Sequence, residues 1–242
     1  VQQQQPTWKR AVQTIDNNIG EAVGKIYVEK HFPPEAKARM EKLVQNLLVA
    51  FGQGIDGLEW MSPDTKKAAH EKLGKFTYKI GYPDKWRDYS ALEIKADDLA
   101  GNLIRSTQFD YDRNLNKLGK PIDRSEWLMT PQTINASYNP ILNEVVVPAA
   151  MFQPPLFDPE ADDAANYGAI GAIVGHELGH GFDDRGRQLD GAGRALNWWT
   201  ASDAEAFEAK AQALVAQFNA FSPIAGARVN GLVMLRENAN DL

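Results

Sequence analysis

Cysteine is absent from the 242 residues of this chain. This absence excludes disulfide bonds, thiol nucleophiles and every metal or iron–sulfur site that depends on thiolate ligands. Histidine and carboxylate side chains would therefore have to bind any metal ion. A chain without cysteine fits both a reducing compartment and a bacterial exported protein, so this feature leaves the location open.

The sequence also lacks a long apolar run and an excess of positive charge. No segment approaches the roughly 20 apolar residues that a membrane-spanning helix needs, so we expect no membrane span in this chain. The 26 Lys and Arg residues against 32 Asp and Glu give a net charge of -6. This charge argues against a polyanion-binding surface and hence against a nucleic-acid partner. The hydrophobic content of 43% is instead enough for a substantial core.

Apolar residues spaced three and four apart predict helices in the first half of the chain. Ser62 before Pro63 is typical of a helix N-terminus. Asp97 or Asp98 is expected to cap a later helix that ends at Gly119. The predicted helices cover residues 8–26, 40–52, 63–74 and 98–118.

Two short β-prone runs follow, at residues 133–138 and 144–147. Asn139-Pro140 and Asn143 between them predict a hairpin or an edge strand. Two further helices are expected. Asp162 or Asp163 is the candidate N-cap of the first, and Thr200 or Ser202 that of the second, where Ser202 and Glu205 fit a capping box. The sequence therefore predicts a mainly α-helical fold with a small β element.

Residues 176–180 read His-Glu-Leu-Gly-His and contain two of the four histidines. On an α-helix, His176 and His180 lie about 40° apart around the axis and about 6 Å apart along it, so both imidazoles can reach one ion. Imidazole nitrogen is a usual ligand of zinc. Glu177 projects from the flank of the same face, where its carboxylate could take a proton from a water molecule that the metal activates. On a helix, this pattern is typical of zinc metalloproteases.

A catalytic zinc site needs a third protein ligand and an open fourth position. Glu237 is the best candidate, because it lies four residues before Asp241 and the two share a helical face. One carboxylate could bind the metal while the other orients a ligand histidine. Asp183, three residues after His180, could play the same orienting part.

The segments around these residues are as distinctive as the histidine pattern. Residues 174–184 read VGHELGHGFDD, residues 197–200 read NWWT, and residues 237–241 read ENAND. Residues 135–138 read NASY and are followed by two proline-containing runs at 148–155. Together with short matches between Trp8 and Pro83, these segments resemble the neprilysin family of zinc metalloendopeptidases over nearly the whole chain.

The resemblance implies a thermolysin-like zincin core with the His-Glu-x-x-His pattern on a central helix. It implies that one Zn²⁺ per chain is bound by His176, His180 and Glu237. Glu177 would be the general base of a zinc-dependent endopeptidase that hydrolyses oligopeptides.

The resemblance also implies roles for residues around the metal. Asp241 and Asp183 would orient the first and the second histidine, respectively. Asn135 and the backbone of Ala136 would hold an extended peptide at the edge strand, in the manner of an added strand. Ser137 stands where the family has an aromatic residue, and this departure would loosen one wall of the substrate groove.

The family pattern further implies a domain organisation. Residues 1–130 would form a helical region that links to a second lobe, and residues 131–242 the zinc-binding catalytic core, incomplete at its C-terminus. The family continues through a segment with an oxyanion-stabilising histidine and a substrate-binding arginine. We therefore expect an internal fragment of a larger enzyme, with oligopeptides and the missing portions of its parent as partners. The resemblance favours an extracytoplasmic location.

Two other functions stay open at this point. The piece could be a catalytically incomplete module that binds peptide or complements the rest of its parent, because the oxyanion and substrate-binding groups lie outside it. Alternatively, the zinc site could hydrolyse an ester or a non-peptide amide.

Overall fold

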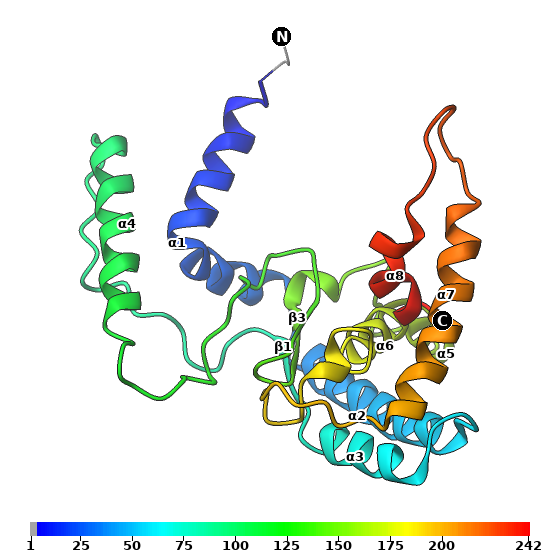
Figure 1. Cartoon of the computed structure of the whole chain (residues 1–242). Coiled ribbons are helices and arrows are strands. Elements are labelled where there is room, and N and C mark those ends of the chain that lie inside the picture. The colour runs from blue at the N-terminus through cyan, green and yellow to red at the C-terminus, as the bar shows by residue number, and fades with distance from the viewer. Residues whose placement is uncertain (1–3) are drawn as a thin grey trace. The chain divides into compact units, whose positions relative to one another are not determined.

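Helices dominate the chain, as the sequence predicts. The computed structural model describes residues 4–242, and Figure 1 shows its elements in chain order. The α-helices are α1 (Thr7–His31), α2 (Pro34–Gly57), α3 (Pro63–Leu73), α4 (Leu99–Leu115), α5 (Asp163–Asn166), α6 (Ala172–Gly179), α7 (Ala201–Asn219) and α8 (Gly231–Asn240). The strands are β1 (Thr77–Gly81), β2 (Ser137–Asn139) and β3 (Glu144–Pro148). The prediction of a mainly α-helical fold with a small β element is confirmed.

The chain divides into two compact units. The first contains the described residues up to 33 together with 81–133 and 148–150, and the second contains 34–80, 134–147 and 151–242. The second unit holds the His-Glu-x-x-His segment. The family resemblance implies a different division, into residues 1–130 and 131–242. This division concerns the lobes of a larger protein and stays a prediction. No helix within residues 4–242 is both long enough and apolar enough to cross a membrane.

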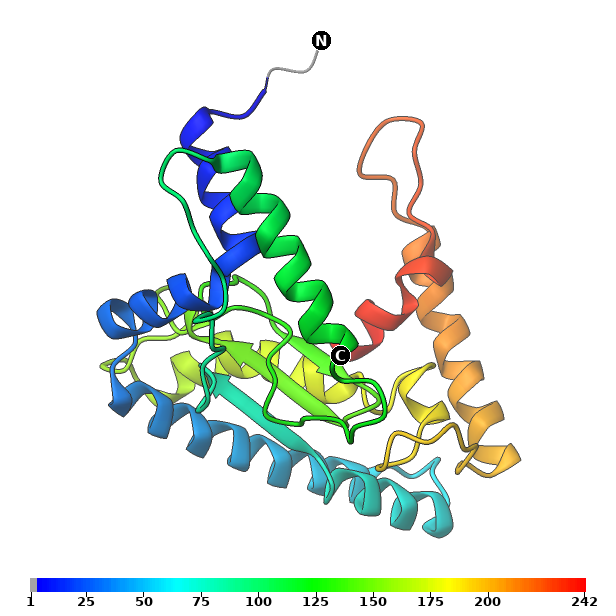
Figure 2. The same ribbon diagram turned by 90° about the vertical axis from the view of Figure 1, so that its left-hand side faces the viewer.

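In the first unit, α1 and α4 run alongside each other (Figure 2). The backbone of α1 is kinked at Ile19, where φ is -131° and ψ is 31°. Its buried positions are Gly20, Gly24 and Val28, whereas much of the apolar stripe found in the sequence is exposed, with Trp8 at 64%. Two glycines and Val28, rather than the apolar stripe, therefore form the packed face of α1.

The second unit contains a three-stranded sheet in the order β1-β3-β2. β2 and β3 are antiparallel, with Ser137 opposite Val146, so the predicted hairpin is confirmed and β2 lies at the edge. Asn143 takes a positive φ of 51° in the connection. Its side-chain oxygen accepts a buried hydrogen bond from the Tyr138 hydroxyl at 2.9 Å. β1 was not predicted, because its five residues follow α3 so closely that no alternation of apolar and polar residues marks them as a strand.

Several helix ends differ from the sequence-based expectation, because α1 continues past residue 26 to His31 and α2 already begins at Pro34. α2 continues to Gly57, beyond the predicted end near Gly52 and Gly54. A Cβ atom at Gly52 would lie 3.4 Å from the Leu73 side chain, so this glycine lies in the helix where α3 approaches. α4 ends before Gly119, which has a φ of 73° and follows a series of hydrogen-bonded turns.

The N-termini of α3 and α7 are joined by shared hydrogen bonds. Ser62 caps α3, as predicted, and Thr200 caps α7 by accepting from the Asp203 N–H. The alternative capping box of Ser202 with Glu205 is therefore wrong. The buried Asp203 carboxylate accepts from the Ser62 N–H at 3.0 Å and from the Ser62 hydroxyl.

Lys72 on α3 anchors the loop that follows α6. Its side chain is buried, and Nζ donates to the carbonyl oxygens of Gly186 and Leu189, both at 2.7 Å. The faces of the Phe182 and Trp198 rings lie 5.7 and 5.8 Å from Nζ. Burial lowers the pKa of Lys72 to about 8, although nearby aspartates act in the opposite direction. The chain thus keeps a cation in its interior to hold this loop.

Stability of the metal-free chain should rise with pH between about 8 and 9.5. Above pH 8 the folded chain loses the Lys72 proton, whereas unfolded lysine keeps its proton up to about pH 10.4, so unfolding takes up a proton. The expected slope from this group approaches about 1.4 kcal/mol per pH unit. Urea unfolding at several pH values measures it. Lys72→Met should remove the rise and Lys75→Met should keep it, and an equal pH dependence in both variants would contradict the assignment.

Asp203→Ala should lower the free energy of unfolding by about 2 kcal/mol, because the half-buried Ser62 N–H and hydroxyl lose a charged acceptor. Glu205→Ala, two residues on and exposed, is the matched control and should change stability by less than about 0.5 kcal/mol. Urea midpoints at pH 7 compare the two variants. Equal midpoints would show that the joined caps add nothing to stability.

Candidate metal centre

The His-Glu-x-x-His segment forms the end of a continuous helical stretch. Asp162 caps α5 as predicted, and α5 leads through a π-helical turn (Tyr167–Gly171) directly into α6. His180 stands at the C-cap position with φ -58° and ψ -20°, and its N–H donates to the His176 carbonyl at 3.2 Å. The two imidazoles are therefore held one helical turn apart, with ring centroids separated by 4.7 Å. α6 contacts α2, α8 and β2, so its predicted central position is confirmed.

Two imidazoles and two carboxylates converge beside α6. Among the described residues, His176, Glu177 and His180 form a group whose potential ligand atoms lie within 4.8 Å of one another. Glu237 on α8 places Oε2 at 3.3 Å from His176 Nε2 and 3.7 Å from His180 Nε2. Two imidazole nitrogens and one carboxylate oxygen around one point fit the donor set of a zinc site.

A carboxylate holds the other nitrogen of each imidazole. His176 Nδ1 lies 2.7 Å from Asp241 Oδ1, and His180 Nδ1 lies 2.8 Å from Asp183 Oδ2. A proton on Nδ1 would leave the Nε2 lone pair free to bind a metal. The structure thus brings each aspartate named in the sequence analysis to the histidine that it was expected to orient.

Asp183 is the most enclosed of these carboxylates, with a side chain that is 0% exposed. Its Oδ1 accepts from the backbone N–H groups of Arg185 and Gly186 at 2.9 and 2.7 Å. Burial alone would raise the pKa of Asp183. The hydrogen bonds from His180, these two backbone groups and Arg236 outweigh burial and hold the pKa below its usual range. Asp183 is therefore a fixed negative charge behind the second histidine.

Two residues of α8 at this position escaped the sequence analysis. Arg236 Nε donates to Asp183 Oδ2 at 3.0 Å, and Asn240 Nδ2 lies 2.6 Å from His180 Nδ1. A Cβ atom on Gly179 would lie 2.6 Å from the Asn240 side chain, so this glycine permits the close approach of α8 to α6. Residues 236 and 240 are one helical turn apart, and this spacing was the signal that could have found them.

Glu177 is buried where α6 contacts β2. Its carboxylate accepts a hydrogen bond from the backbone N–H of Tyr138, and the residue is 8% exposed. Burial raises the pKa of Glu177, while the neighbouring imidazoles and the Tyr138 N–H partly offset that effect. A carboxylate with a raised pKa beside two metal-binding candidates is suited to accept a proton and return it.

Asn135 and Ala136 directly precede the edge strand β2. Asn135 is exposed and its side-chain oxygen accepts from the Ala136 N–H at 3.0 Å, whereas Ala136 is buried. β2 pairs with β3 on one side and contacts α6. The two residues thus lie at the start of a strand whose neighbour is the helix that carries Glu177.

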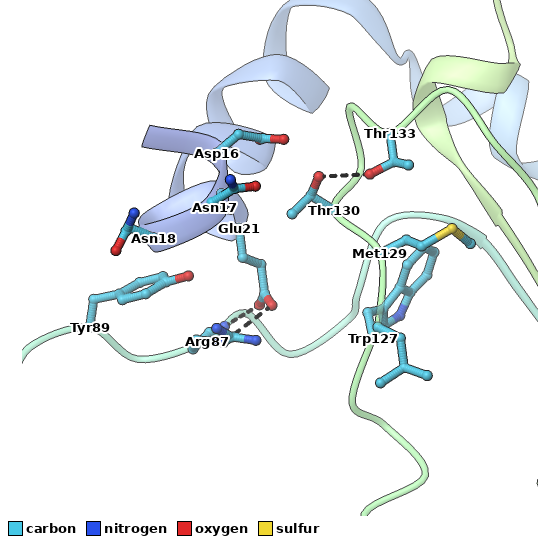
Figure 3. Close-up of a pocket in the computed structure, with 12 residues that line it drawn as sticks. Asp16, Asn17, Asn18, Glu21, Arg87, Tyr89, Trp127, Met129, Thr130 and Thr133 are labelled. Atoms are coloured by element: carbon cyan, nitrogen blue, oxygen red, sulfur yellow. Dashed lines mark hydrogen bonds and ion pairs between the residues drawn. The ribbon is translucent and has the colours of Figure 1, made fainter. Parts of the chain in front are cut away.

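Two cavities contain none of the converging donors, although the one in the second unit is lined in part by Asp183 and Asn240 beside His180. In the second unit, an apolar cavity of about 440 Å³ is lined by helix residues such as Phe51, Ile55 and Phe207 and by Phe182 and Trp199 from the segment between α6 and α7. The first unit contains a polar pocket of about 300 Å³ (Figure 3), where Glu21 pairs with Arg87 and Thr130 bonds to Thr133. Neither lining includes a histidine. These cavities therefore do not extend the donor set.

Sequence comparison gives matches over most of the chain. Residues 1–83 and 135–242 match the two sequence patterns of peptidase family M13. The chain is 37% identical over 245 residues to neprilysin of Homo sapiens, an alignment that covers 97% of this chain and 33% of that protein. It is 35% identical over 241 residues to an endothelin-converting enzyme homolog of Locusta migratoria, with 97% and 33% covered.

Solved structures agree with these matches. The zinc metalloprotease Zmp1 of Mycobacterium tuberculosis, in complex with an inhibitor, matches with a TM-score of 0.93 and 51% identity over 100% of this chain and 37% of that chain. PepO of Lactobacillus rhamnosis matches with a TM-score of 0.84 and 34% identity over 93% of this chain and 36% of that chain. The chain thus spans about a third of the length of the curated relatives. On this evidence the chain belongs to peptidase family M13, the neprilysin family.

Proposed function

We propose that this chain carries the zinc-binding core of an endopeptidase that hydrolyses peptide bonds of oligopeptides. The observation that supports this proposal most is the convergence of His176 Nε2, His180 Nε2 and Glu237 Oε2, with contacts of 3.3 and 3.7 Å. These three residues would hold one Zn²⁺. Asp241 and Asp183 would fix the tautomer and orientation of the imidazoles from behind.

The bound metal would lower the pKa of a water molecule toward about 7 and polarise the substrate carbonyl. Glu177 takes up the proton of the attacking water and returns it to the leaving amine. Burial raises the pKa of the Glu177 carboxylate, which makes the protonated state accessible for the second transfer.

The edge strand β2 supplies a place for an extended substrate. A peptide bound along β2 would form main-chain hydrogen bonds, which tolerate many sequences. Asn135 and Ala136 lie where such a peptide would meet the start of the strand. This arrangement supports oligopeptides as the substrate class. From the family we further infer an extracytoplasmic location and an association with the remaining portions of the parent protein.

A second candidate is a catalytically incomplete module that binds peptide or complements those portions. The observations that favour it are the coverage of about a third of the relatives and the exposure of Glu237 and Asp241, at 50% and 69% of their side chains. Purified chain with one zinc and no turnover, which regains turnover when the remaining portions are added, would identify this case.

The zinc site could instead hydrolyse an ester or a non-peptide amide. A substrate panel in which such compounds are hydrolysed and peptides are not would identify this alternative.

Glu177→Gln should reduce peptide turnover by about 10² to 10⁴-fold, because the amide cannot accept the proton of the attacking water. Zinc content should stay at one per chain. Cleavage of a fluorogenic peptide at equal zinc loading measures the effect, with the exposed Glu205→Gln as control. A variant that cleaves as fast as the parent would show that Glu177 is not the base.

Asp183→Asn should weaken zinc binding by about 10 to 100-fold, because His180 loses the charged partner of Nδ1. The neighbouring Asp184→Asn is the matched control, since no hydrogen bond joins Asp184 to either imidazole in the described structure. Competition with a chelating indicator gives both dissociation constants. Equal values for the two variants would refute the orienting role of Asp183.

A further inference from the structure

Arg236 stands one residue before Glu237 and has no part in the proposed chemistry. Its Nε lies 3.0 Å from Asp183 Oδ2, the same oxygen that meets His180 Nδ1. The Asp183 side chain is 0% exposed and that of Arg236 is 31% exposed. Because a guanidinium keeps its charge in proteins, this contact is an ion pair whenever Asp183 is ionised.

α8 is held at its two ends by different kinds of contact. Its first half packs on α7, where Leu235 forms a buried cluster with Ala211 and Val215. The Gly231 N–H also donates to Asn219 at 2.8 Å. Figure 1 shows α8 beside α7 in this region. The second half carries Glu237 and faces α6 through polar side chains, while Ala239 in this half also packs against the Leu235 cluster.

The carboxylates gathered at this second contact repel one another and weaken the docking of α8, although Asp241 also bonds to His176 on α6. Two carboxylates come from α8 and two from α6 and the turn after it, namely Glu237, Asp241, Glu177 and Asp183. Like charges gathered in a partly buried site repel one another. Arg236 brings the opposite charge on α8 itself. Lys72 also acts on Asp183, but its Nζ donates to two carbonyls of the loop after α6 and does not hold α8. Asn240 adds a neutral contact.

We infer that Arg236 is a positioning residue that keeps the second half of α8 docked on α6 when no metal is bound. The inference rests on the proposed function only for the role of Glu237 as a ligand. Arg236 binds Oδ2 of Asp183, whose Oδ1 already accepts hydrogen bonds from two backbone N–H groups. Glu237, the next residue, is thereby held beside both imidazoles. When a metal ion binds, Glu237 is then already in place as the third donor. Binding therefore avoids the loss of conformational entropy that ordering the end of α8 would require.

Hydrogen exchange of the metal-free chain tests this inference. Arg236→Gln should raise the exchange rates of amides 235–240 by about tenfold or more, as expected for the loss of a hydrogen bond between charged groups. Amides of α2 and α3 should keep their rates, which shows that the unit remains folded. Arg228→Gln removes the same charge from an exposed position before α8 and should leave α8 unchanged. Arg236→Lys should restore part of the protection because it keeps the charge.

Zinc binding gives a second readout. Arg236→Gln should weaken zinc binding by about tenfold in competition with a chelating indicator, and saturating zinc should return the α8 amides to the exchange rates of the parent. Unchanged α8 exchange in the metal-free variant, or tighter zinc binding than in the parent, would overturn the inference. A chain that binds zinc without cleaving peptides would refute the proposed hydrolysis and not the role of Arg236. If the chain binds no zinc at all, the exchange rates still decide that role.

Discussion

The approach of a carboxylate on α8 to two imidazoles on α6 is the contact on which the rest of this site depends. His176 and His180 come from one helical turn, and their spacing follows from helix geometry alone. Glu237 comes from another helix, and its oxygen reaches both Nε2 atoms only because Gly179 lets the two helices approach. The packing of α7 and α8 is therefore part of the metal centre as well as of the fold.

The sequence predicted those parts of the site that depend on local spacing. The histidine pair and Glu177 follow from five consecutive residues, and Asp183 follows from its place three residues later. Glu237 and Asp241 lie some 60 positions away, and helical spacing could only show that they share a face. The family resemblance was needed to link that face to the histidines.

Contacts between distant positions explain what the sequence could not predict. Arg236 meets a partner 53 positions away, and Lys72 donates to a carbonyl 114 positions away. Nothing in the local sequence of α3 distinguishes Lys72 from its exposed neighbours, because its burial results from the loop that folds over it. The same reason applies to Gly52, where a glycine expected to end α2 lies inside the helix because α3 packs against it.

The π-helical turn at Tyr167–Gly171 has a consequence for the direction in which the imidazoles face. A π turn contains about one residue more than an α turn, so it offsets the helix that follows by about 100° around the axis. The histidine pair keeps its internal spacing whatever precedes it, but its azimuth relative to α5 is set by this extra residue. Deleting one residue from the turn would convert it to regular α-helix and rotate either α5 or the imidazoles out of their present surroundings. The orientation of the imidazoles therefore depends on the length of this uncharged segment as well as on its residues.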